Sequence, residues 1–165
     1  MPTDTPTARL DGDLLDMMAR GVSVIVSSSG PDLTPSVMRA VGSDVAPDGR
    51  RITVFLSRSQ SNVLLQDIAR SGRVSVVFSE PFSHRSVQIK SDQARVRAIT
   101  PEEVTGLPRY LQAMQRELDL VGFSPAFAAA MLAHQVDDLS AVEFEPHQAF
   151  DQTPGPRAGD RLTTA

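Results

Sequence analysis

The sequence contains no cysteine and no tryptophan, and its 16 basic residues include a single lysine, Lys90. Without cysteine the chain can form neither a disulfide framework nor a thiolate metal site. Its first residues lack the basic region followed by an apolar run that marks a secretory signal. Its longest apolar runs are far shorter than the roughly 20 residues that a membrane-spanning helix needs. We therefore expect a cytoplasmic protein with no membrane partner.

A concentration of positive charge is also missing from the sequence. The net charge is -4, the pI is about 5.3, and the arginines are scattered along the chain. Nucleic-acid binding needs a concentrated positive surface, because contacts to the phosphate backbone supply most of the affinity. We therefore expect a small molecule or a protein as partner, and no nucleic acid.

The common motifs of catalytic and nucleotide-binding sites are absent as well. No glycine-rich phosphate loop follows a predicted strand, and no serine lies in a GxSxG turn. The three histidines, His84, His134 and His147, lack the spacing of metal ligands. The sequence thus indicates no metal site, and it singles out no catalytic acid, base or nucleophile.

The pattern of apolar residues predicts a mainly β protein with added helices. With 165 residues and 41% hydrophobic content, the chain fits one globular domain. Period-two alternation predicts strands at residues 22–29, 36–41, 51–57, 73–79, 85–98 and 139–145. The strand at 85–98 either runs straight or bends near Ser91. Apolar residues at helical spacing predict helices at 11–20 and 62–70 and within an insertion at 100–135.

Short connections between these strands favour antiparallel pairing, and a sheet of this size tends to close on itself because closure removes its edges. We predict a six-stranded antiparallel barrel formed by residues 1–150, with the helical insertion at 100–135. The capping-box pattern of Thr100 predicts a helix start, and Pro108 is expected to break or kink that helix. The proline- and glycine-rich tail, residues 151–165, is predicted to be an extended arm or disordered.

The segment FLSRSQSN brings many hydrogen-bond donors to the predicted start of a helix. Its polar residues are Ser57, Arg58, Ser59, Gln60, Ser61 and Asn62. Free N–H groups and the helix dipole favour an anion at a helix N-terminus, and the arginine fork is suited to phosphate. An ordinary N-cap provided by one of the serines is the alternative interpretation.

Three more polar residues are candidates for the same site. Arg39 lies on the predicted second strand, and Gln88 and Lys90 share one face of the fifth. If the barrel closes in sequence order, these residues and segment 57–62 face one groove. An anion there would meet two or three cations, and Gln88 could hydrogen-bond an amide-like ring edge. The alternative is that Gln88 and Lys90 are ordinary polar residues on a solvated strand face.

The motifs PSVMRA, RITVFLSRSQSN, RVSVVF and HRSVQIK follow one another, with a hairpin and a short helix between them. In this order, over about residues 10–98, they resemble the split-barrel flavin-binding superfamily related to pyridoxamine 5'-phosphate oxidase. The resemblance implies a six-stranded antiparallel split barrel and an obligate homodimer with FMN at its interface. It implies that Arg39 and residues 57–62 lie near the FMN phosphate, and that Gln88 and Lys90 lie near the isoalloxazine ring or the ribityl chain.

The chain also departs from the oxidase itself. VMRAVG supplies the arginine but not the lysine of the oxidase's Arg-x-x-Leu-Leu-Lys run, and there is no clear basic motif for pyridoxal phosphate near the C-terminus. We therefore expect an FMN-dependent oxidoreductase or flavin reductase with another small-molecule substrate. One alternative is a non-enzymatic module that binds a flavin, a deazaflavin or haem, with His84 as a weak candidate for an axial ligand. The other is a cofactor-free interaction protein.

Overall fold

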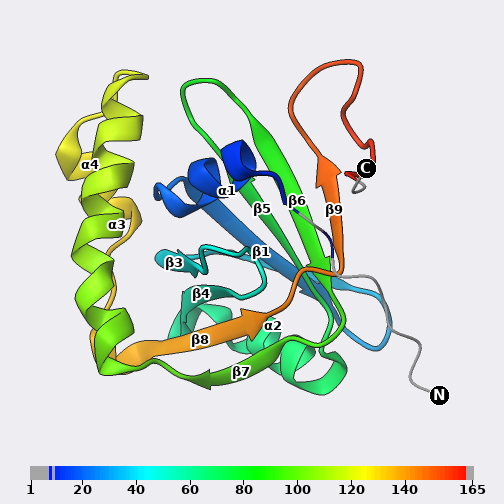
Figure 1. Ribbon diagram of the computed structural model, residues 1–165. Helices are drawn as coiled ribbons and strands as arrows, with labels where there is room; N and C mark the ends of the chain where they lie inside the picture. The colour runs from blue at the N-terminus through cyan, green and yellow to red at the C-terminus, as the bar shows by residue number, and fades with distance from the viewer. Residues whose placement is uncertain (1–7, 9, 163–165) are drawn as a thin grey trace.

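The computed structural model describes residue 8 and residues 10–162 of the chain (Figure 1). In this part of the chain two antiparallel sheets form the body of the molecule. The five-stranded sheet has the order β2 (Pro35–Arg39), β1 (Ser23–Ser29), β5 (Val74–Ser79), β6 (Ser86–Ser91) and β9 (Gln148–Asp151). The four-stranded sheet has the order β3 (Gly42–Val45), β4 (Ile52–Ser57), β8 (Leu139–Phe144) and β7 (Arg95–Ala98). The helices are α1 (Gly12–Ala19), α2 (Arg58–Ser71), α3 (Pro101–Asp119) and α4 (Pro125–Met131), with a 3-10 turn η1 (Val136–Asp138).

Two of the six expected strands each contribute to both sheets. The expected second strand divides at a corner, because the Ala40 N–H bonds to Val24 O (3.0 Å) in one sheet and the Val41 N–H to Phe55 O (2.9 Å) in the other. The expected fifth strand bends after Ser91 into β6 and β7, which confirms one of its two predicted forms. With β9 the described chain has nine strands instead of six. They form two sheets that do not join into one closed barrel, an arrangement consistent with a split-barrel-like fold.

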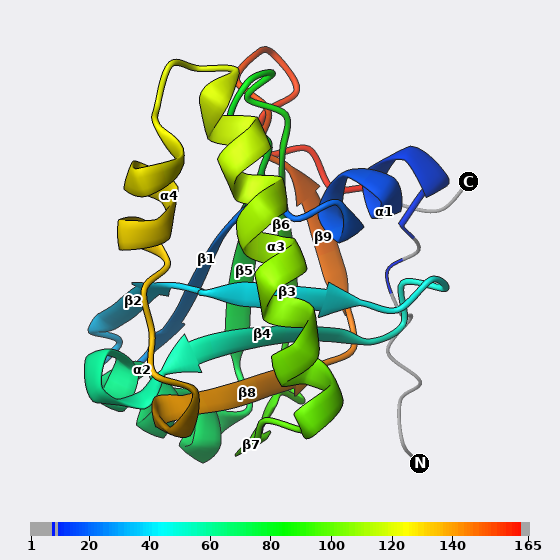
Figure 2. The same cartoon turned by 90° about the vertical axis from the view of Figure 1, so that its left-hand side faces the viewer.

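The main core lies between the two sheets, on the faces that the sequence alternation predicts. Val24, Val26, Val76 and Phe78 are fully buried, while their neighbours along β1 and β5 are partly exposed. Strand β4 is buried along its whole length, because α3 covers the outer side of its sheet (Figure 2). Burying this apolar surface on both sides of β4 is the main favourable contribution to folding here.

The helical insertion forms a hairpin of α3 and α4. As predicted, the Thr100 hydroxyl accepts a hydrogen bond from the Glu103 N–H (3.3 Å), and the Glu103 carboxylate accepts one from the Thr100 N–H (2.9 Å). Pro108 does not end the helix, which continues to Asp119. The facing apolar residues of the hairpin form a small core of their own: Tyr110, Met114, Leu118, Ala128 and Leu132. No helix in the described part of the chain is both long and apolar enough to span a bilayer.

The second helix starts earlier than predicted but ends where the sequence indicates. It begins at Arg58, with Ser57 in the N-cap position, so the polar segment predicted to precede the helix forms its first turn. Gly72 has a φ of 68° and caps the helix in the left-handed conformation, as the sequence predicts.

The C-terminal tail folds back along β9 in its described part, residues 151–162. The Asp151 N–H bonds to Asp160 O (2.9 Å) and the Leu162 N–H to Ala149 O (2.8 Å). These backbone hydrogen bonds replace the extended or disordered arm that the proline and glycine content predicts. They also cover the outer edge of the five-stranded sheet, which would otherwise leave unpaired backbone groups. The last three residues lie outside the described part of the chain.

Candidate functional site

The outer face of the five-stranded sheet carries three of the predicted site residues. Its outward side chains are largely small or polar and partly exposed. Strand register places Arg39, Ile25, Val77, Gln88 and Phe150 in one row across the five strands. Three strand spacings separate the backbones at the arginine and the glutamine, a distance of about 14 Å. The row therefore has a polar group on each side of an apolar centre.

Both polar groups of this row already have hydrogen-bond partners. Arg39 Nη1 donates to the Ser23 hydroxyl at 2.7 Å. Gln88 Nε2 donates to the Ser75 hydroxyl at 2.8 Å, and Gln88 Oε1 accepts from Gln152 Nε2 at 3.1 Å. These contacts fix the orientation of both side chains on the outer face, so a ligand would meet them in a defined geometry.

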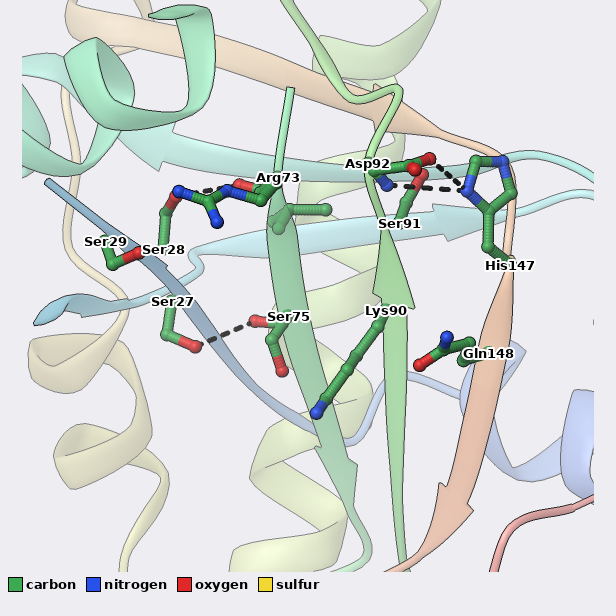
Figure 3. Close-up of a pocket in the computed structure, with 11 residues that line it drawn as sticks. Ser27, Ser28, Ser29, Arg73, Ser75, Lys90, Ser91, Asp92, His147 and Gln148 are labelled. Carbon is green, nitrogen blue, oxygen red and sulfur yellow. Dashed lines mark hydrogen bonds and ion pairs between the residues drawn. The ribbon is translucent and has the colours of Figure 1, made fainter. Parts of the chain in front are cut away.

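Lys90 lies in the next row, in a groove of about 420 Å³ (Figure 3). Its Nζ lies 5.0 Å from the centroid of the Phe150 ring, within cation–π distance. It forms no ion pair with any described residue. At one end of the groove His147 Nδ1 lies 2.5 Å from Asp92 Oδ1. We call this the Lys90 groove; its other lining residues are Ser27, Ser28, Ser29, Arg73, Val74, Ser75, Ser91 and Gln148.

The start of α2 binds an anion in this structure, and that anion belongs to the chain itself. Ser59 donates its backbone N–H to Asp138 Oδ1 (3.1 Å) and its hydroxyl to Asp138 Oδ2 (2.7 Å). The Ser57 hydroxyl donates to Asp138 Oδ2, and Arg58 Nη2 donates to the carbonyl oxygen of Asp137. The hydroxyl of Ser57, followed by that of Ser59, lowers the pKa of Asp138 below its ordinary value. The carboxylate is therefore charged at neutral pH.

The remaining residues of the predicted segment differ in their exposure. Gln60 and Asn62 are exposed, and Asn62 Oδ1 accepts a hydrogen bond from Gln66 Nε2 (2.6 Å). Ser61 is 2% exposed, and its hydroxyl has no hydrogen-bond partner among the described residues. The first turn of α2 thus contains one buried polar group that the folded chain leaves unsatisfied.

The predicted residues form two groups rather than one groove. Residues 57–62 belong to the start of α2, and Lys90 lies beside Ser75, just beyond the end of that helix. A helix of 14 residues is about 21 Å long, and the groove beside Arg58 shares no lining residue with the Lys90 groove. We call residues 57–62 the α2 group; Arg39 lies on β2 and lines neither groove.

Two functional candidates were not predicted from the sequence. Asp138 contacts Ser59 across 79 positions of the chain, and its only local signal is the adjacent acidic pair before β8. Phe150 lies close to Lys90 because β9 pairs with β6, and no strand was predicted at residues 148–151. The proposed haem ligand His84 is exposed in the turn between β5 and β6 and lines neither groove.

No protein-family model matches the chain, and no curated protein sequence gives a significant match. Solved structures do match. A putative pyridoxamine 5'-phosphate oxidase from Lactobacillus delbrueckii superposes with a TM-score of 0.54 at 13% identity, covering 86% of this chain and 93% of its own. A pyridoxamine 5'-phosphate oxidase-related, FMN-binding protein from Nostoc punctiforme gives 0.50 at 9% identity, covering 88% and 86%.

A haem-binding protein from Mycobacterium smegmatis also superposes, with a TM-score of 0.51 at 13% identity over 94% of this chain and 59% of its own. The chain shares its fold with these proteins. The predicted likeness to the split-barrel superfamily is therefore confirmed at the level of the fold. At these identities the comparison supports no transfer of individual site residues.

Proposed function

We propose that this protein binds FMN and acts as a flavin-dependent oxidoreductase on a small molecule. The proposal is supported by the fold that it shares with an FMN-binding protein. The observation that carries it is the donor set at the start of α2. Ser57 and Ser59 bind a carboxylate there through two hydroxyls and a backbone N–H, and a phosphate group needs donors of the same kind.

In this proposal the phosphate binds at the start of α2, at residues 57–62, with Arg39 contributing a second positive charge beside Arg58. Gln88 and Lys90 face the isoalloxazine ring or the ribityl chain. Lys90 and the start of α2 line separate grooves, and a second copy of the chain can bring the two grooves to one flavin. The proposal therefore includes a homodimer with the flavin between its subunits.

The flavin supplies the redox chemistry when it is bound, and the chain holds and orients it. Ser57, Arg58 and Ser59 bind the phosphate end, and Gln88 hydrogen-bonds the edge of the ring. The apolar centre of the row, Ile25 and Val77, offers a flat surface without competing donors. No titratable residue is assigned as acid or base, so proton transfer is left to the flavin and solvent.

To test the proposal, the apoprotein is titrated with FMN, and binding is monitored by the quenching of flavin fluorescence. We expect Arg39→Ala to weaken FMN binding by about 1–3 kcal/mol, as loss of one charge-assisted hydrogen bond does. Arg50→Ala is the matched control, because Arg50 is exposed and lies at a different groove. If both variants bind FMN with equal affinity, the phosphate does not bind at Arg39. A haem absorption band in place of flavin binding would favour the haem-binding alternative, whose fold the chain also shares.

A further inference from the structure

Asp138 occupies the donors that the proposed function assigns to the phosphate. Its two carboxylate oxygens accept all three hydrogen bonds that Ser57 and Ser59 provide there. A phosphate cannot accept these hydrogen bonds while the carboxylate does, and two anions side by side repel each other. Binding of a phosphate at this place therefore requires Asp138 to leave.

The carboxylate does not satisfy every donor of this turn. Ser61 lies in the first turn of α2, is 2% exposed, and has a hydroxyl without a partner among the described residues. Its φ and ψ of -118° and 18° depart from helical values. Asp138 thus leaves one donor of this turn unpaired, and a phosphate has more acceptor oxygens than a carboxylate.

The segment that contains Asp138 is short and makes few side-chain contacts with the rest of the protein. It is the 3-10 turn η1, which joins α4 to β8, and Val136 at its start is 47% exposed. Apart from the hydrogen bonds of Asp138, a side chain bonds to η1 at one place among the described residues, where Arg58 donates to the carbonyl oxygen of Asp137. Displacing η1 thus exposes little apolar surface.

We propose that Asp138 is an internal competitor for the phosphate of the cofactor, and so sets the affinity of this site for phosphate-bearing ligands. In the free protein its carboxylate fills the donors at the start of α2. Ligand binding displaces the carboxylate from these donors. This inference rests on the proposed function, because that function places the phosphate at Ser57 and Ser59.

The test compares Asp138→Asn with Asp137→Asn at low ionic strength. Both variants lose one negative charge at neighbouring positions, but only Asp138 holds the serines with its side chain. Inorganic phosphate is titrated while the amide signal of Ser59 is followed by NMR, and FMN and riboflavin are titrated by fluorescence. We expect Asp138→Asn to bind phosphate and FMN at least about tenfold more tightly than the unmodified protein, since a competing charge-assisted interaction is lost. We expect the affinity of Asp138→Asn for riboflavin to stay unchanged. We also expect Asp137→Asn to bind phosphate and FMN as tightly as the unmodified protein does.

The other possible results either support or contradict competition between Asp138 and phosphate. Equal phosphate affinity in Asp138→Asn and the unmodified protein overturns it, as does an equal gain in Asp137→Asn, which would show a general charge effect. Tighter phosphate binding at the Ser59 amide without FMN binding in any variant upholds the competition and rejects the proposed cofactor. Adding Ser59→Ala to Asp138→Asn should abolish the gain. Circular dichroism verifies that all variants are folded.

Discussion

Gly72 shows how one residue decides the end of an element. It adopts a φ of 68°, and a Cβ at this position would lie 2.6 Å from the carbonyl oxygen of Asp92. That oxygen is backbone and belongs to the bend between β6 and β7, so it cannot move aside without shifting both strands. Gly106, in the body of α3, has nothing within 4 Å of its added Cβ and no left-handed φ.

We therefore expect opposite effects from the same substitution at these two glycines. Gly72→Ala should lower the free energy of unfolding by about 2 kcal/mol, because alanine adds both strain and a backbone clash. Gly106→Ala should raise it by up to about 1 kcal/mol, because alanine is the better helix former. Urea unfolding monitored by circular dichroism measures both. A stabilising Gly72→Ala would contradict the role of the left-handed cap.

The candidate site was partly predictable at this scale. Serine hydroxyls, an arginine and free N–H groups favour an anion in any fold, so segment 57–62 indicates its chemistry from residue types alone. The group that meets those donors comes from Asp138, 79 positions beyond Ser59. No local pattern connects positions so far apart, because only the packing of η1 against α2 brings them together.

At the scale of the elements, ion pairs connect the start of α3 to the four-stranded sheet. The Arg97 guanidinium on β7 hydrogen-bonds the carboxylates of Glu103 on α3 (2.6 Å) and Glu143 on β8 (2.9 Å). The hydrogen bond from Arg97 lowers the pKa of Glu103 below its ordinary value of 4.5. A lowered pKa means that the folded protein favours the ionised carboxylate, so this contact stabilises the fold above pH 4.5 and is lost as the pH falls through the lower folded-state pKa.

Glu103→Gln isolates this charge, because glutamine also fits the capping box of Thr100. We expect the variant to lose roughly 1 kcal/mol of stability at pH 7, since the pair is partly exposed and screened by solvent. The difference from the unmodified protein should shrink as the pH falls below 4.5. Thermal unfolding across this pH range measures it. A difference that persists to low pH would mean that the charge is not its cause.

The elements themselves were predicted more fully than their grouping into sheets. Strands β1, β4, β5 and β8 lie where strands were predicted. Buried and partly exposed positions alternate along β1 and β5, whereas β4 and β8 are almost entirely buried. The corner at Ala40 and Val41 was missed, since a strand that passes from one sheet to the other keeps its apolar pattern through the bend. Strand β9 was not predicted, because a short strand after Pro146 has little sequence pattern and its partner β6 is distant in sequence.

At the scale of the whole molecule, we expect two copies of the chain to bind each flavin between them. The fold alone follows from the comparisons, whereas the cofactor and the dimer are proposals. The separation of the α2 group from the Lys90 groove is the structural reason to link them. In the proposed dimer, one chain contributes the phosphate end of the site and its partner contributes the ring end.

The most direct test of this claim is to load the purified protein with FMN, remove the excess, and determine flavin content and mass together. Absorption bands of bound flavin give the cofactor-to-chain ratio, and sedimentation gives the number of chains in the particle that carries the flavin. We expect one FMN per chain in a particle of two chains. A colourless protein after loading, or FMN held by a monomer, would contradict it.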